Sequence, residues 1–163
     1  MNKLHIPPLD EQAAKTALEH QKILAKPPLA LGKLEPVAIQ IAAMTGNPAP
    51  RLKDKAVVLF AADHHIADHG LSLTSTDVTY IQTRNFLQGG GTINAFTRNA
   101  GARLSVVDVG VNYDFGDLPG LVKRKVMHGA NDFSRGPAMT REQALECLQV
   151  GIDMAREEKA RGL

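Results

Sequence analysis

The apolar run at residues 56–62 constrains the fold of this 163-residue chain more than any other feature, because it contains no polar side chain. Its β-branched residues and polar flanks predict a β-strand buried on both faces, as in a parallel sheet. Residues 104–109 predict a second buried strand, with Asp108 near its carboxyl end. A weaker third strand is expected at residues 122–127.

Helical segments surround these strands. Apolar spacing predicts helices at residues 10–25, 36–46, 76–88, 92–99 and 141–161. Asp10 is the expected N-cap of the first helix, and Thr140 with Gln143 forms a capping-box pattern before the last. Strands that alternate with helices predict an α/β fold, here a partial doubly wound (Rossmann-like), mostly parallel sheet with flanking helices. We expect an N-terminal helical segment at residues 1–50 and an incomplete α/β domain at residues 51–163.

Composition limits the classes of partner. The net charge is only +2 and the basic residues are scattered without interleaved aromatic side chains, so we expect no nucleic-acid partner. No stretch approaches the roughly 20 apolar residues of a membrane helix, so we expect no membrane partner. The single cysteine, Cys147, cannot form an internal disulfide and is expected to be a small core residue. A cytoplasmic, soluble protein is the prediction.

The candidate site lies where the strands end. Asp63 and His64 follow the first strand, and Asp108 stands at the end of the second. Ligands of open α/β sheets bind at the carboxyl ends of the strands, so we expect these residues to meet there.

The polar residues after the first strand also allow a metal site. Five of the seven residues 63–69 are Asp or His. One interpretation is a metal-dependent phosphoesterase of the DHH type, which would need further acids from other strands to hold two metals. The strand itself supplies none, so we expect no metal. The alternative, which we favour for His65 and His69, is a polar loop with exposed, unligated imidazoles.

Two glycine-containing loops are further candidates. Gly89, Gly90 and Gly91 precede a helix, where backbone N–H groups can approach a phosphate, although close helix packing or a helix break explains them equally well. Residues 129–140 form a long loop whose Asn131 and Arg135 offer hydrogen bonds to a ligand. A structural loop that leads to a capped helix is the preferred interpretation.

Several motifs, taken in order, resemble one family. Lys26-Pro27-Pro28 with residues 31–35 is similar to a KPPGSLGRLE motif, and residues 60–64 are similar to an FAADHG strand end. Further matches in order and spacing occur at residues 78–79, 85–87, 89–90, 93–94, 107–110 and 136–144. The chain therefore resembles the N-terminal half of the nicotinate-nucleotide–dimethylbenzimidazole phosphoribosyltransferases. It departs from their pattern at His65, where the family has glycine, and at Leu29-Ala30, where the family has Gly-Ser.

The resemblance implies a function and a set of residues. The family transfers phosphoribose from nicotinate mononucleotide to 5,6-dimethylbenzimidazole and so makes the lower-ligand nucleotide of cobalamin. The resemblance implies that Gln82 and Thr74 line the benzimidazole pocket and that Asp63 and His64 stand at the site, although a turn or helix-cap role is an equal alternative for Thr74. With Gly89, Gly90 and Asp108 from the loop and the second strand end, these form the expected substrate-binding residues, and no cofactor is expected. The phosphate loop and the general-base glutamate are expected beyond residue 163, so no catalytic residue is assigned.

The missing parts leave two functional classes open. The chain is either part of a phosphoribosyltransferase, working as a homodimer or with a complementing C-terminal half, or a non-catalytic remnant that binds a base or another subunit.

Overall fold

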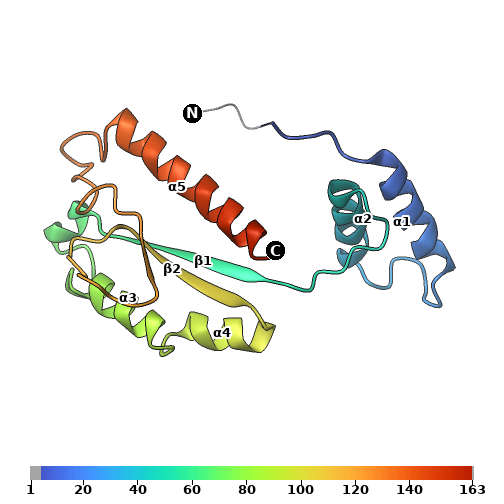
Figure 1. The fold of residues 1–163 in the computed structure, drawn as a ribbon, viewed down its shortest axis with the longest axis horizontal. Helices are drawn as coiled ribbons and strands as arrows, with labels where there is room; N and C mark the ends of the chain where they lie inside the picture. Colours follow the sequence, from blue (N-terminus) through green and yellow to red (C-terminus); the bar gives the residue numbers. More distant parts are fainter. Residues whose placement is uncertain (1–4, 163) are drawn as a thin grey trace. The chain divides into compact units, whose positions relative to one another are not determined.

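Three parallel strands form the sheet at the centre of the α/β part of the chain (Figure 1). The computed structural model describes residues 5–162. The strands are β1 (Ala56–Ala62), β2 (Arg103–Gly110) and β3 (Leu121–Lys123), in the order β1-β2-β3. The expected α/β fold with a parallel sheet is confirmed.

Helices cover both faces of this sheet, with α3 (Val78–Leu87) and α4 (Thr92–Ala100) on one side and α5 (Arg141–Ala160) on the other (Figure 1). Alternation of side chains along β2 gives two cores. Val106 belongs to the core that includes Phe86 and Leu87 of α3, whereas its neighbour Val107 packs against Val150 and Met154 of α5.

The expectation of burial is right for the middle of β2, whose Leu104 and Val109 are half-buried, and wrong for β1. Ser105 to Asp108 are buried, but the residues of β1 are mostly half-buried and Phe60 is 46% exposed. Within residues 5–162, β1 has β2 as its only strand neighbour and therefore stands at the sheet edge. An apolar sequence predicts that a strand can be buried on both faces. How much of it is buried depends on which strands and helices pack beside it.

The third strand is shorter than expected. β3 ends at Lys123 rather than continuing to residue 127. The chain nevertheless still follows β2, since the N–H groups of Arg124 and Val126 donate to the carbonyls of Asp108 and Val109. The expected strand thus continues as irregular backbone, which carries residues 124–130 to the carboxyl edge of the sheet.

Three helix ends are as expected, whereas the second helix begins at Leu34, two residues before the expected start. The Asp10 side chain accepts a hydrogen bond from Ala13 N–H at the start of α1 (Glu11–Ile23), and Thr140 and Gln143 cap α5 reciprocally. Gly46, which follows α2 (Leu34–Thr45), adopts the left-handed conformation that glycine tolerates at helix ends. The sequence did not indicate the 3₁₀-helix η1 (His65–His69).

Helices α1 and α2 form a separate hairpin. The two helices contact each other, and their buried apolar side chains are all small: Ala13 and Ala17 on α1, Ala42 and Ala43 on α2. Lys26 in the connecting loop and Glu35 in the first turn of α2 form an ion pair of 2.7 Å, and their side chains are 14% and 8% exposed.

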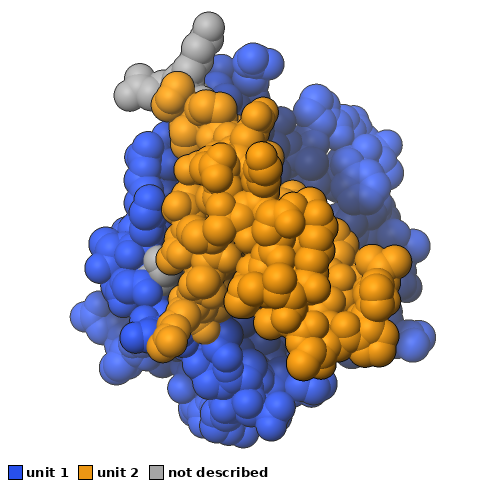
Figure 2. Space-filling view, turned by 90° about the vertical axis from the view of Figure 1, so that its right-hand side faces the viewer, with its two compact units in different colours: residues 1, 53–163 blue, residues 2–52 orange. Residues whose placement is uncertain are grey.

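The chain divides into two compact units, residues 2–52 and residues 53–163, coloured separately in Figure 2. Each is described by itself. No helix in the described range 5–162 has the length and apolar character needed to cross a bilayer.

Candidate functional site

Three segments meet at the carboxyl edge of the sheet. The Asp63 N–H, just after β1, donates to the carbonyl of Gly110 at the end of β2 (3.0 Å). The Asp63 carbonyl accepts from Ala130 N–H (2.8 Å), and the Ala130 carbonyl accepts from His65 N–H (2.9 Å). The backbone itself therefore fixes Asp63 and His64 between the loop after β2 and the loop at residues 128–130.

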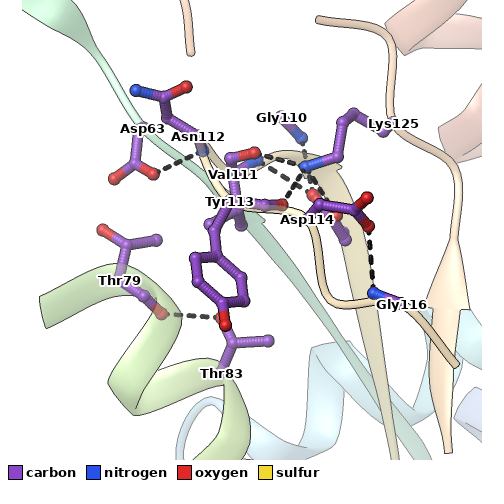
Figure 3. A network of polar contacts seen from close by, with 11 residues as sticks. Asp63, Thr79, Thr83, Gly110, Val111, Asn112, Tyr113, Asp114, Gly116 and Lys125 are labelled. Carbon is purple, nitrogen blue, oxygen red and sulfur yellow. Dashed lines mark hydrogen bonds and ion pairs between the residues drawn. The ribbon is translucent and has the colours of Figure 1, made fainter. Parts of the chain in front are cut away.

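The Asp63 carboxylate is bound to the loop after β2. Its Oδ2 accepts a hydrogen bond of 2.7 Å from the N–H of Asn112 (Figure 3). The side chain of Asp63 is half-buried, and His64 beside it is exposed. These two residues stand where the sequence placed the candidate site.

Asp108 lies near Asp63, but both of its carboxylate oxygens already bind groups of the protein. Its Oδ1 accepts hydrogen bonds from the N–H groups of Gly110 and Val111, and its Oδ2 forms an ion pair of 2.9 Å with Lys125. The carboxylate side chain is 4% exposed. Asp108 lines a cavity of about 310 Å³ that does not include Asp63. These contacts give Asp108 a structural role, and a substrate contact for it stays a prediction.

Three hollows share Asp63 and His64 as a common wall. The first, of about 310 Å³, is apolar and lies between the sheet and α5; it is lined by Phe60, Met127 and Leu148 among others. The second, of about 130 Å³, is polar and includes Tyr80 and Tyr113. The third, of about 170 Å³, is lined by hydroxyl-bearing residues before and within α3 and by small apolar ones: Ala62, Ala67, Ser72, Thr74, Ser75, Thr76, Val78 and Thr79.

The structure brings together some of the expected residues and not others. Thr74 shares the third hollow with Asp63 and His64. Gln82 is exposed on α3, where its side-chain oxygen accepts from Asn85 at 3.2 Å, and it lines none of the three hollows around Asp63. Gly89 and Gly90 lie at the junction of α3 and α4, also outside these hollows. Substrate contacts for these residues stay predictions.

The imidazoles that were expected to be unligated make hydrogen bonds within the protein. His65 Nδ1 lies 2.9 Å from Asp68, and His69 Nε2 lies 2.7 Å from Asp132. The hydrogen bond to Asp68, followed by that to the carbonyl of His128, raises the pKa of His65. His69, and then Ser134, hold the pKa of Asp132 well below its usual range. In the described part of the chain, no group of three or more His, Cys, Asp or Glu side chains is placed to hold a metal ion.

A pair of stacked tyrosines at the site was not singled out from the sequence. The rings of Tyr80 and Tyr113 lie 4.5 Å apart, and the Arg84 guanidinium lies 5.6 Å from the Tyr113 ring. Tyr113 is five positions beyond Asp108, so its place after a strand end was a usable signal. Tyr80 could not be found this way, because its partner comes from a distant segment.

The loop at residues 129–140 and Cys147 were also candidates. Arg135 forms an ion pair of 3.1 Å with Asp132 within this loop, and its side chain is 77% exposed, so a ligand contact for it stays a prediction. Cys147 is half-buried and lines the apolar hollow, and burial raises the pKa of its thiol.

The parallel sheet with hollows at its carboxyl edge is the architecture of open α/β proteins, in which ligands generally bind outside the strand ends. The phosphoribosyltransferase family model matches residues 6–163, so the chain belongs to this family.

Its relatives narrow the class to nicotinate-nucleotide–dimethylbenzimidazole phosphoribosyltransferases. The chain is 46% identical over 156 residues to the enzyme of that name from Geobacter sulfurreducens, a match that covers 96% of this chain and 44% of the relative. The corresponding enzyme from Chloroflexus aggregans is 46% identical over 153 residues, with 94% and 43% covered. The resemblance seen in the sequence is confirmed.

A solved structure agrees. The nicotinate-nucleotide–dimethylbenzimidazole phosphoribosyltransferase from Thermus thermophilus superposes with a TM-score of 0.89 at 42% identity, covering 94% of this chain and 47% of that chain. This chain therefore spans less than half the length of the relatives it matches.

Proposed function

We propose that this chain supplies one part of a site that transfers phosphoribose from nicotinate mononucleotide to 5,6-dimethylbenzimidazole, giving α-ribazole 5′-phosphate and nicotinate. The observation that carries the proposal is the hollow shared by Asp63, His64 and Thr74 at the carboxyl edge of the sheet, in a chain of this family. The substrates are small molecules of the cytoplasm, and the product belongs to cobalamin synthesis.

The third hollow suits the flat base. A heterocycle needs apolar walls and a few polar groups that fix its orientation. Ala62, Ala67 and Val78 supply such walls, while Thr74 and His64 supply polar groups at the rim. The volume of about 170 Å³ fits one small bicyclic ring rather than a whole nucleotide.

The reaction also needs groups that the resemblance places beyond residue 163. The pyridinium of nicotinate mononucleotide is already cationic, so its glycosidic bond breaks without an acid. The incoming benzimidazole must lose its N–H proton as its other nitrogen attacks, which requires a general base. We therefore expect this chain alone to bind the base but not to catalyse the transfer.

The test compares the chain alone with a chimaera. The chimaera joins this chain to the part of the Geobacter sulfurreducens relative that lies beyond the matched region. With both substrates, we expect turnover by the chimaera and none by the chain alone. Robust turnover by the chain alone, or a folded chimaera without turnover, would contradict the proposal. A chimaera that binds dimethylbenzimidazole without turnover would favour a non-catalytic binding role instead.

The contribution of Gln82, which the resemblance assigns to the base pocket, is tested in the same chimaera. We expect Gln82→Ala to raise the KM for dimethylbenzimidazole. Gln88→Ala is the matched control, since Gln88 is a second glutamine of this region, at the end of α3. Equal KM values for the two variants would remove Gln82 from the site.

The completing part of the site is proposed to dock on the free edge of β1. Lys55 carbonyl accepts from Arg103 N–H, so alternation turns the backbone groups of residues 56, 58, 60 and 62 away from β2. Phe60 is 46% exposed and Leu148 on α5 is 56% exposed beside this edge. An apolar edge without charge or proline is a template for another strand. We propose that a complementing C-terminal half supplies that strand, and a homodimer is the alternative outcome.

Light scattering distinguishes these partners. The isolated C-terminal part of the Geobacter sulfurreducens relative is mixed with this chain, and a one-to-one complex is expected. Phe60→Lys should abolish the complex, because it would place a charge among the apolar side chains of the hollow beside the new strand. Phe96→Lys, the same change at a phenylalanine 69% exposed on α4, should leave it intact. A dimer of this chain alone that Phe60→Lys disrupts would support the homodimer instead.

A further inference from the structure

The loop after β2 contacts the site directly although it has no regular secondary structure. Asn112 donates its N–H to Asp63, and the ring of Tyr113 stacks on Tyr80 in the polar hollow. A loop holds such positions only if its backbone groups are bound elsewhere. The source of that order is a side chain outside the loop, Lys125.

The ammonium of Lys125 is surrounded by three acceptors. It forms an ion pair with Asp108 Oδ2 at 2.9 Å and donates to the carbonyls of Tyr113 (2.9 Å) and Val111 (Figure 3). An ammonium has three N–H donors, so all three are used. The side chain of Lys125 is 22% exposed, and its charge is balanced by the nearly buried carboxylate of Asp108.

Asp108 completes the clamp from the other side. While its Oδ2 binds Lys125, its Oδ1 accepts from the N–H of Val111 at 2.9 Å. Val111 is thus held through both its N–H and its carbonyl. The next residue, Asn112, donates its N–H to the carboxylate of Asp63, just after the end of the neighbouring strand β1.

We propose that Lys125 is a positioning residue for the site, acting through the loop to hold the Asp63 carboxylate and the Tyr113 ring where a ligand meets them. The identity of that ligand rests on the proposed function. Lys125 itself lines a different cavity from the three around Asp63, so its effect is indirect.

The chemistry of lysine suits this task. Three acceptors around one point require a compact ammonium with donors in several directions, whereas a guanidinium presents its donors in one plane. Nearby Lys123 provides a natural contrast, because it is 51% exposed and pairs with the exposed carboxylate of Asp117. The two lysines are two positions apart and carry the same charge, but only Lys125 binds the loop after β2.

The experiment measures position and binding separately in the full chain. Lys125→Met keeps the apolar stem and removes the ammonium, and Lys123→Met is the matched control. By NMR, we expect the Asn112 amide proton to lose the downfield shift caused by the Asp63 carboxylate in Lys125→Met only. The dissociation constant for dimethylbenzimidazole should rise about tenfold in the same variant, as a small displacement of site groups requires.

Rescue separates positioning from a general loss of stability. In a Cys147→Ser background, Lys125→Cys is alkylated with 2-bromoethylamine, which restores an ammonium at nearly the original place. Recovery of the Asn112 shift and of base binding is expected. An unchanged Asn112 shift in Lys125→Met, or restored folding without restored shift, would overturn the proposal. Failure of the unaltered chain to bind dimethylbenzimidazole would instead refute the proposed function, while the Asn112 shift still decides the role of Lys125.

Discussion

Replacing Glu158 with alanine is expected to loosen α5 from the sheet. The Glu158 side chain is 2% exposed, and its carboxylate accepts from Ser105 Oγ at 2.6 Å and from Arg103 at 3.0 Å. Arg161 adds a third contact at 3.0 Å. This cluster connects the last turn of α5 to the first residues of β2, at the end of the sheet away from the candidate site.

The magnitude follows from what each partner loses. A hydrogen bond to a charged group contributes about 1.5–3 kcal/mol. Arg103 and Arg161 are 39% and 53% exposed, so water replaces most of their lost contact. Ser105 is buried and is left without its acceptor, which costs about 1–3 kcal/mol. With the lost packing of the side chain, we expect Glu158→Ala to lower the free energy of unfolding by about 3 kcal/mol.

Urea unfolding followed by circular dichroism measures this change. Glu157→Ala is the control, because Glu157 has one ion pair, to Arg124, and is 36% exposed, so its loss should cost less than about 1 kcal/mol. Equal losses in the two variants would refute the assignment of Glu158 as an anchor.

The same carboxylate predicts a dependence on pH. The hydrogen bond from Ser105 lowers the pKa of Glu158 most; burial opposes this, and Arg103 lowers it further. The contribution of the ionised Glu158 to the free energy of unfolding is therefore complete above the unfolded pKa of about 4.3. It is lost as the pH falls through the lower pKa of the folded state. The difference between the unaltered chain and Glu158→Ala should narrow below about pH 4.

Three further predictions concern single residues. Leu29 has φ +62° and is 76% exposed, so Leu29→Gly should stabilise the chain by about 0.5 kcal/mol in urea unfolding, whereas Leu29→Ala keeps the strain and should not. The hydrogen bond to Asp68 is the first cause of the raised pKa of His65. The contribution of His65 to the stability of the fold is therefore present below its unfolded pKa and is lost as the pH rises through its folded pKa. His65→Gln should lower the free energy of unfolding at pH 6 and change it little at pH 9. The raised pKa of the Cys147 thiol predicts slow alkylation by iodoacetamide at pH 7.5 and fast alkylation in urea; equal rates would contradict it.

Local patterns predicted the helices and two of the strands well. The Asp10 and Thr140 caps and the glycine at Gly46 are decided within a few residues, so the sequence alone locates them. The edge position of β1 depends on how many strands surround it, which no pattern inside residues 56–62 contains. For this reason the exposure of Phe60 could not be predicted.

The site shows the same division. Asp63 and His64 were predicted because strand ends of a parallel sheet meet at one edge. Asp108 met the same criterion, yet its side chain points to Lys125 rather than to the hollows around Asp63. Successive side chains of a strand point to opposite faces of the sheet. Whether a strand-end side chain faces the candidate site or the interior therefore depends on which groups from distant segments lie next to it. Lys125, Tyr80 and His128 are such groups, and their contacts span too much sequence to be read from it.

The two departures from the family pattern differ in how the structure accommodates them. His65 stands where the family has glycine, and its ring packs on Gly129, where an added Cβ would lie 2.9 Å from His65 Nε2. The ring fits because residue 129 has no side chain, and it gains hydrogen bonds to Asp68 and to the carbonyl of His128. Leu29 replaces another family glycine but keeps the left-handed backbone and an exposed side chain. The bulk of His65 is therefore accommodated beside the candidate site, whereas Leu29 leaves a strained backbone in the N-terminal loop. The strand-end turn thus tolerates His65 without displacing Asp63.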